Sequence, residues 1–217
     1  MWKLRSALVV ASLALVTLAG CADRSAGGDA PRFADSGAIG AWVDSNLITF
    51  DDVREVVGRE STVVLAEVAG VDQGHTYAAS ESYGTVEYRH AAVTLRVSRV
   101  FKGADSVAED GSLVVSVPLG AALVDESGRD AEGSGPGWTT PTLAEVRRAI
   151  PVGSRFVVIG TPRPTTSELD LTHTGSVPKG ASVLDGASAQ LFVADPGEGR
   201  ALAGWPDLTF EELLRRL

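Results

Sequence analysis

The sequence is poor in cysteine, since Cys21 is the only one among 217 residues. Exported domains are often held together by disulfides, but one cysteine cannot form an intramolecular disulfide. A zinc site built on several thiolates is excluded for the same reason. The fold of this chain must therefore rest on its hydrophobic core.

Positive charge is also scarce, and the formal net charge at pH 7 is −9. Residues 1–20 carry two positive charges, Lys3 and Arg5, and no acid, so the rest of the chain carries −9 minus 2, or −11. Nucleic-acid phosphates and anionic lipid surfaces repel such a chain. We therefore expect no nucleic-acid partner, and a neutral or cationic partner instead.

No apolar run is long enough to span a membrane comfortably, which takes about 20 residues. The longest one, residues 7–19, follows Lys3 and Arg5 and is typical of a signal peptide. It ends in Leu18-Ala19-Gly20-Cys21, which resembles the lipobox of bacterial lipoproteins. An ordinary cleaved signal peptide is the alternative. The sole cysteine at the junction favours the lipoprotein.

The lipoprotein resemblance implies cleavage before Cys21 and a diacylglyceryl group on its thiol. Together with a further acyl chain such as palmitate, this anchor would hold the protein on the extracytoplasmic face of a cell membrane. Residues 21–40 are small and polar and predict a flexible tether with a mean reach of roughly 25 Å. Residues 41–217 are then a single extracytoplasmic domain rich in β-structure.

The 24 glycines and 10 prolines favour many short strands and turns over a helical bundle. Runs rich in β-branched residues, some with apolar and polar positions in alternation, predict five strands. These strands cover residues 61–69, 86–101, 112–117, 155–160 and 189–194. The alternation lapses at Arg99–Phe101, which predicts a bulge. Residues 71–84 are predicted to form a loop or ragged hairpin, and the acidic residues 125–141 a loop.

Three short helices are predicted from their capping residues. Thr49 begins a helix that ends near Gly58, and Thr142 begins one that stops before Pro151. The last covers residues 209–217, with Leu208 and Leu213 as a hydrophobic staple. The second and third begin with the S/T-x-x-E pattern of a capping box.

The order of these segments resembles secreted OB-like modules of the netrin/TIMP type. The resemblance rests on VVLAEV, VTLRVSRVFKG, LVVSV and IPVGSRFVVIG, followed by a late strand and a terminal helix, over residues 61–217. It implies a mainly β fold, a five-stranded OB-like barrel with short peripheral helices and a C-terminal helix. The inhibitory mechanism of TIMPs does not carry over, because it needs a free amino-terminal cysteine and Cys21 would be acylated.

No histidine metal motif and no nucleophile elbow appears in the sequence. His75, His90 and His173 lack H-x-x-x-H or H-E-x-x-H spacing, and there is no G-x-S-x-G. The acids of residues 125–132 lack the EF-hand spacing and read as a solvated loop. We predict no catalytic residue, no metal and no cofactor, and structural roles for the histidines.

Aromatic residues in polar segments are the remaining binding candidates. Trp42, Trp138 and Trp205 qualify, and Trp138 is the candidate ligand contact because its loop offers it no obvious core. Packing over the ends of the sheet is the alternative. The sequence thus predicts a non-enzymatic lipoprotein that binds a protein, glycan or small ligand at the cell surface. The alternative is a cell-envelope hydrolase or metal-dependent enzyme with scattered active-site residues.

Overall fold

The computed structural model describes residues 50–82, 84–125, 127, 129, 142–162, 170–186 and 188–217. Cys21, Trp42 and Trp138 lie outside these residues, as do Thr49 and most of the predicted loop 125–141. The predictions made for them are therefore not tested by the fold.

The described residues form a mainly β structure around one mixed sheet of seven strands. Its strands are β1 (Thr62–Glu81), β2 (Gly84–Lys102), β3 (Ser112–Val124), β4 (Arg155–Gly160), β5 (Asp170–His173), β6 (Val183–Asp185) and β7 (Phe192–Ala194). Their order is β6-β3-β2-β1-β4-β7, and β5 pairs with the far part of β1. All pairs are antiparallel except β3 with β6.

The sheet corrects the prediction of five strands. Residues 170–173 and 183–185 form two additional strands, and the last predicted strand contracts to Phe192–Ala194. Strands of three or four residues are too short to show a hydrophobic period, so sequence patterns miss them. The observed pairings follow an open path between β6 and β7, and the predicted closure into a barrel is not confirmed.

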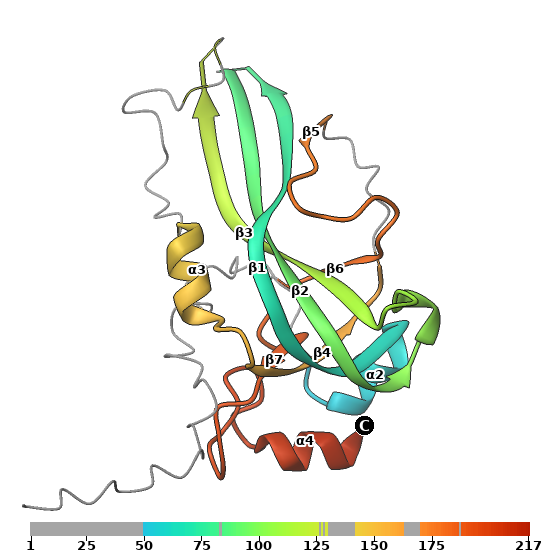
Figure 1. Cartoon of the computed structure of the whole chain (residues 1–217). Coiled ribbons are helices and arrows are strands. Elements are labelled where there is room, and N and C mark those ends of the chain that lie inside the picture. Colours follow the sequence, from blue (N-terminus) through green and yellow to red (C-terminus); the bar gives the residue numbers. More distant parts are fainter. Residues whose placement is uncertain are drawn as a thin grey trace, which may run out of the picture.

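The first and third strands are much longer than predicted and the second is slightly longer. The far parts of these three strands project from the rest of the molecule as a curved arm (Figure 1). The arm consists of residues 76–81, 84–90 and 118–124, and the remainder of the domain is the body. Of the two forms predicted for residues 71–84, the ragged hairpin is found and the loop is not, because these residues continue β1 and turn into β2. Backbone hydrogen bonds between the strands hold these residues in the sheet, so a strand can form here without alternating apolar and polar side chains.

Within the described residues three α-helices pack around the sheet, besides the short 3-10 helix η1 (Ala104–Ser106). They are α2 (Val53–Arg59), α3 (Leu143–Ala149) and α4 (Phe210–Arg216). Both predicted capping boxes are confirmed, with Thr142 and Glu145 at α3 and Thr209 and Glu212 at α4. Helix α2 begins later than predicted, because Asp52 is its N-cap and accepts a hydrogen bond from the Arg54 amide.

The body is buried on both faces of its sheet. Phe156 and Val158 of β4 pack in one apolar cluster with α3, whereas Val157 and Ile159 pack in a second one beneath α2 and α4. This two-sided burial explains why residues 155–160 form an almost continuous apolar run rather than an alternating one.

The predicted bulge near Arg99–Phe101 is confirmed. Val63 pairs with Lys102 and Val64 with Val100, so Phe101 is an additional residue in β2. Ser98, three positions earlier, is another one. Gly103 follows at φ 74°, and a Cβ there would clash with the carbonyl oxygen of Ser61. Gly103 therefore allows β2 to leave the sheet directly beside the start of β1.

Replacing Gly103 with alanine is expected to destabilise the domain by about 3 kcal/mol or more, because backbone strain and a clash coincide. Gly111→Ala is the matched control, since Gly111 has φ 78° but nothing within 4 Å of its Cβ position. That control should cost only about 1–2 kcal/mol. Urea unfolding of both variants checks this, and equal losses would contradict the packing argument.

Candidate functional site

The structure brings His75 and His90 together around Tyr77, although 14 positions separate the two histidines in the sequence. The Tyr77 hydroxyl lies 3.1 Å from His75 Nδ1, within hydrogen-bond distance. The Tyr77 ring meets His75 edge-on at 5.7 Å between centroids and His90 at 5.6 Å. We call His75, Tyr77 and His90 the imidazole cluster.

Two bulges place this cluster where the arm leaves the body. Gln73 pairs with Ala91 and Thr76 with Arg89, so Gly74 and His75 together face the single residue His90. On the other side of His90, β3 also carries an additional residue, Leu119, between the partners Pro118 and Gly120. Bulges bend a strand and re-aim its side chains. The predicted end of the third strand at Pro118 is thus wrong, since the strand continues beyond this bulge to Val124.

The bulge in β1 is tightly enclosed. A Cβ at Gly74 would lie 2.8 Å from the carbonyl carbon of Ala91, so no side chain fits there. The turn at residues 174–176 closes the other side, because Ser176 N and Oγ donate to the Gln73 carbonyl oxygen at 2.8 and 2.9 Å. Gly175, at φ 58°, permits this approach, since a Cβ there would clash with the Gln73 and Gly74 carbonyl oxygens.

Burial keeps both imidazoles neutral near pH 7. It lowers the pKa of His75, whose exposed fraction is 4%. Burial is the largest influence on the pKa of His90 and lowers it. The His75 and Tyr88 carbonyls and the carboxylate of Asp185 act in the opposite direction, and the charge of His75 lowers the pKa further. Among the described residues, His90 Nδ1 is buried with no hydrogen-bond partner. Such an unsatisfied buried atom is uncommon and marks a site with a specific role or strain.

The cluster lies on the outer face of the sheet. Ala91 and Val93 point into the main core, so His90 and Ala92 point to the opposite face, as does Tyr88. Tyr88 is half-buried and pairs with Tyr77 across the strands. Tyr77, Tyr88 and His90 therefore form an aromatic stripe on this face.

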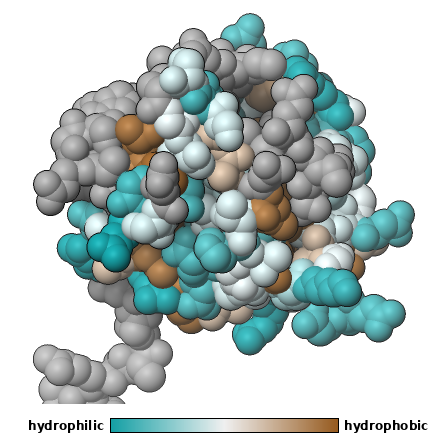
Figure 2. Space-filling view, turned by 90° about the horizontal axis from the view of Figure 1, so that it is seen from above, coloured by the Kyte–Doolittle hydropathy of each residue, from teal (hydrophilic) through white to brown (hydrophobic). Residues whose placement is uncertain are grey.

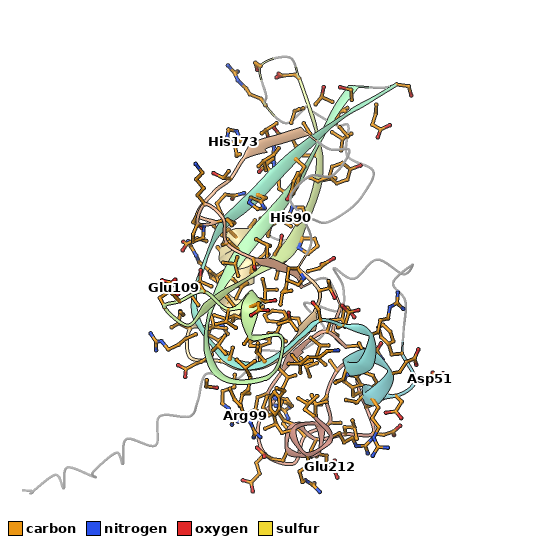
Figure 3. All side chains as sticks on the ribbon, turned by 90° about the vertical axis from the view of Figure 1, so that its right-hand side faces the viewer. Asp51, His90, Arg99, Glu109, His173 and Glu212 are labelled. Carbon is orange, nitrogen blue, oxygen red and sulfur yellow. The ribbon has the colours of Figure 1, made fainter. Side chains whose placement is uncertain are left out.

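The third histidine is near but separate. His173 of β5 pairs with Thr76, directly after His75, yet its side chain is exposed (Figure 3). Among the described residues, no three His, Cys, Asp or Glu side chains are arranged to hold a metal ion. The chemistry that the cluster offers is hydrogen bonding, aromatic contact and proton uptake.

A cavity of about 390 Å³ lies elsewhere, between the end of α2, the end of β4 and β6. Glu60, Thr161 and Asp185 contribute polar groups to its lining, and Leu191 contributes an apolar one. None of the three histidines lines this cavity. The histidines and this cavity are therefore not combined into one enclosed site.

Of the predicted binding residues, Trp205 can be placed. It is buried in the cluster beneath α2 and α4, and its Nε1 donates to the Gln190 carbonyl oxygen at 3.3 Å. It thus packs in the core, as the alternative held, while Trp42 and Trp138 lie outside the described residues. Tyr77 was not predicted from the sequence. The only signal for it is the segment Gly74-His75-Thr76-Tyr77, in which two aromatic side chains, His75 and Tyr77, alternate after a glycine.

No helix within the described ranges is both long and apolar enough to cross a membrane. The surface seen from the tip of the arm shows hydrophobic residues in separate patches among hydrophilic ones (Figure 2).

The chain matches no family model, no curated protein and no solved structure.

The imidazole cluster predicts a loss of stability on mild acidification. Because the folded-state pKa of His90 lies below its ordinary value of 6.5, the unfolded chain binds more protons as the pH falls below 6.5. Stability is therefore complete above that pH and should fall by on the order of 1 kcal/mol toward pH 5. Urea unfolding between pH 7.5 and 5 measures this.

His75→Gln combined with His90→Gln should flatten this profile, and His173→Gln should leave it unchanged. The capping carboxylates act in a different window. Hydrogen bonds from Thr142 and Thr209 lower the pKa of Glu145 and Glu212, so their contribution is lost only as the pH falls below 4.5. A profile that stays flat down to pH 5 in the unaltered protein would contradict the assignment.

Proposed function

We propose that this chain is a lipid-anchored binding protein on the extracytoplasmic face of a cell membrane. The observation that carries the proposal is the succession of Lys3 and Arg5, the apolar residues 7–19 and the lipobox Leu18-Ala19-Gly20-Cys21. An acylated Cys21 at the start of a polar tether would keep the domain near the membrane without burying any of it.

The arrangement of the domain supports a binding role. Phe50, the first described residue, is buried beneath α2 and α4, and these helices lie at the end of the domain opposite the arm (Figure 1). A tether that enters at this end leaves the arm as the far end of the molecule. The arm and its junction with the body are then the parts most accessible to a partner.

The aromatic stripe of Tyr77, Tyr88 and His90 is the surface that we propose for the contact. Half-buried aromatic side chains with polar tips combine apolar area with hydrogen bonding and are common anchors in interfaces. The net charge of −9 favours a neutral or cationic partner, which agrees with a protein, a glycan or a small ligand. Trp138 stays a predicted further contact.

The OB-like barrel also belongs to this proposal. OB-folds bind ligands on the face of their second and third strands. In this chain Tyr88 and His90 lie on β2, and β2 pairs with β3 throughout the arm. A closed barrel would present these side chains on a curved surface.

An enzymatic role is the second candidate, and the two neutral imidazoles favour it. A neutral histidine is the form that accepts a proton as a general base. If the purified protein hydrolysed an ester, amide or glycoside and His75→Gln or His90→Gln abolished the turnover, the enzymatic role would replace the binding role.

The anchor is tested by replacing Cys21 with alanine. The unaltered chain, expressed in bacteria fed with labelled palmitate, should carry the label and sediment with membranes. Cys21→Ala should lose the label and most of the membrane fraction, because Cys21 is the only cysteine in the chain. Ser25→Ala, in the predicted tether, is the matched control. Label retained in Cys21→Ala would refute the anchor.

The binding surface is tested with Tyr88→Ser on cells that display the protein. Cross-linking to neutral and basic surface components should fall about tenfold or more, the range expected for losing an interface anchor. Val152→Ser is the control, since Val152 is 62% exposed but lies in the body away from the stripe. An equal loss in both variants, or in neither, would contradict the proposed surface.

A further inference from the structure

The turn at residues 174–176 is held at the junction of arm and body by hydrogen bonds to Gln73. The Gln73 carbonyl oxygen accepts both hydrogen bonds from Ser176, and the Gln73 side chain reaches the His90 carbonyl oxygen at 3.5 Å. Both imidazoles contact the Tyr77 ring edge-on close to this point.

We propose that this junction is a pH-sensitive latch, in which protonation of His75 and His90 releases the 174–176 turn and β5 from β1. The latch consists of Gln73, His75, His90 and Ser176. The inference goes beyond the proposed function, since it concerns the backbone of the domain and does not depend on acylation of Cys21.

The bulge is tightly enclosed, and this explains why a positive charge on His75 or His90 would force nearby backbone contacts to open. Gly74 lies against the backbone of Ala91 and Ala92, and Gly175 lies against the carbonyls of Gln73 and Gly74. Water cannot reach a charged ring in this packing unless one of these contacts opens. The turn is the contact that opens most readily, because it is exposed and held by few hydrogen bonds.

The charged groups around the cluster do not cancel this effect. Asp185 of β6 favours the His90 cation, but burial outweighs it, and a charged His75 opposes it. Asp72 of β1 forms a salt bridge with Arg147 of α3 at 2.8 Å. Glu87 forms one with Arg89, also on β2, at 3.0 Å.

The remaining titratable groups near the cluster are Tyr77, Tyr88, His173 and Lys179. Burial raises the pKa of Tyr77, so this phenol stays neutral at the pH of the transition. His173 and Lys179 are exposed, so water and salt screen their interactions with the cluster. Neither side chain supplies a negative charge that would favour a cation at the bulge.

Strand β5 is weakly held, so its release is local. It pairs with β1 at Thr76, Tyr77 and Ala78, and Thr172 Oγ1 donates to the Thr76 carbonyl oxygen at 3.1 Å. Its Leu171 is 40% exposed and contributes little buried area. The body, with both faces of β4 in apolar clusters, has no such weak point.

Hydrogen–deuterium exchange with peptide mass analysis tests the latch on the full chain in detergent micelles. Exchange is compared at pH 7.5 and pH 5.5 after correction for the intrinsic rates. Peptides covering residues 73–78 and 171–177 should exchange about tenfold faster at pH 5.5, the factor that one pKa unit provides. The β4 peptide, residues 155–160, should not change.

Substitutions separate the latch from general acid sensitivity. His75→Gln with His90→Gln should remove the pH step, His173→Gln should keep it, and Ser176→Ala should exchange fast at both pH values. The Ser176→Ala and His173→Gln results decide the question even if the double variant fails to fold. Equal exchange of residues 171–177 at both pH values, a step that persists without both histidines, or acceleration that includes β4 would overturn the proposal.

Discussion

The backbone pairing of β1 is the constraint on which the rest of the described structure depends. Strands β2, β4 and β5 all pair with it directly, β3 and β7 are placed through β2 and β4, and β6 through β3. Helix α3 is tied to the same strand, because Arg147 donates to the Val71 carbonyl oxygen and to Asp72 at 2.8 Å. A strand of this length therefore positions both the body and the arm, and a change in its register moves both.

The two halves of β1 lie in different surroundings. In the body its residues pack alternately into two apolar clusters, and in the arm they are mostly half-buried or exposed. The double bulge lies at the change between these regions, where twist and bending must be absorbed. This is also where the chain places two buried histidines and an unsatisfied ring nitrogen, so the irregular strand pairing and the unsatisfied buried atom coincide.

Local patterns predicted several elements correctly, for reasons that are themselves local. The capping boxes of α3 and α4 need residues only three positions apart, and the apolar run 155–160 is bounded by Gly153 and Gly160. The patterns failed where the partner is distant. The polar residues 71–84 left a loop and a ragged hairpin open, and only the backbone bonds to β2 show that residues 71–81 are a strand. Strands β5 and β6 are defined by their backbone pairing with β1 and β3, which lie far away in the sequence.

The sequence by itself determined the single cysteine and hence the absence of an intramolecular disulfide, the acidic charge, the mainly β character and the starts of α3 and α4. Each of these depends on composition or on neighbouring residues. The lipobox and its anchor are likewise predictions of the sequence alone. Only the tertiary structure decided that Trp205 is a core residue and that His75 meets His90. It did so because the antiparallel register and its bulges set which distant side chains become neighbours, and no short sequence window contains that register.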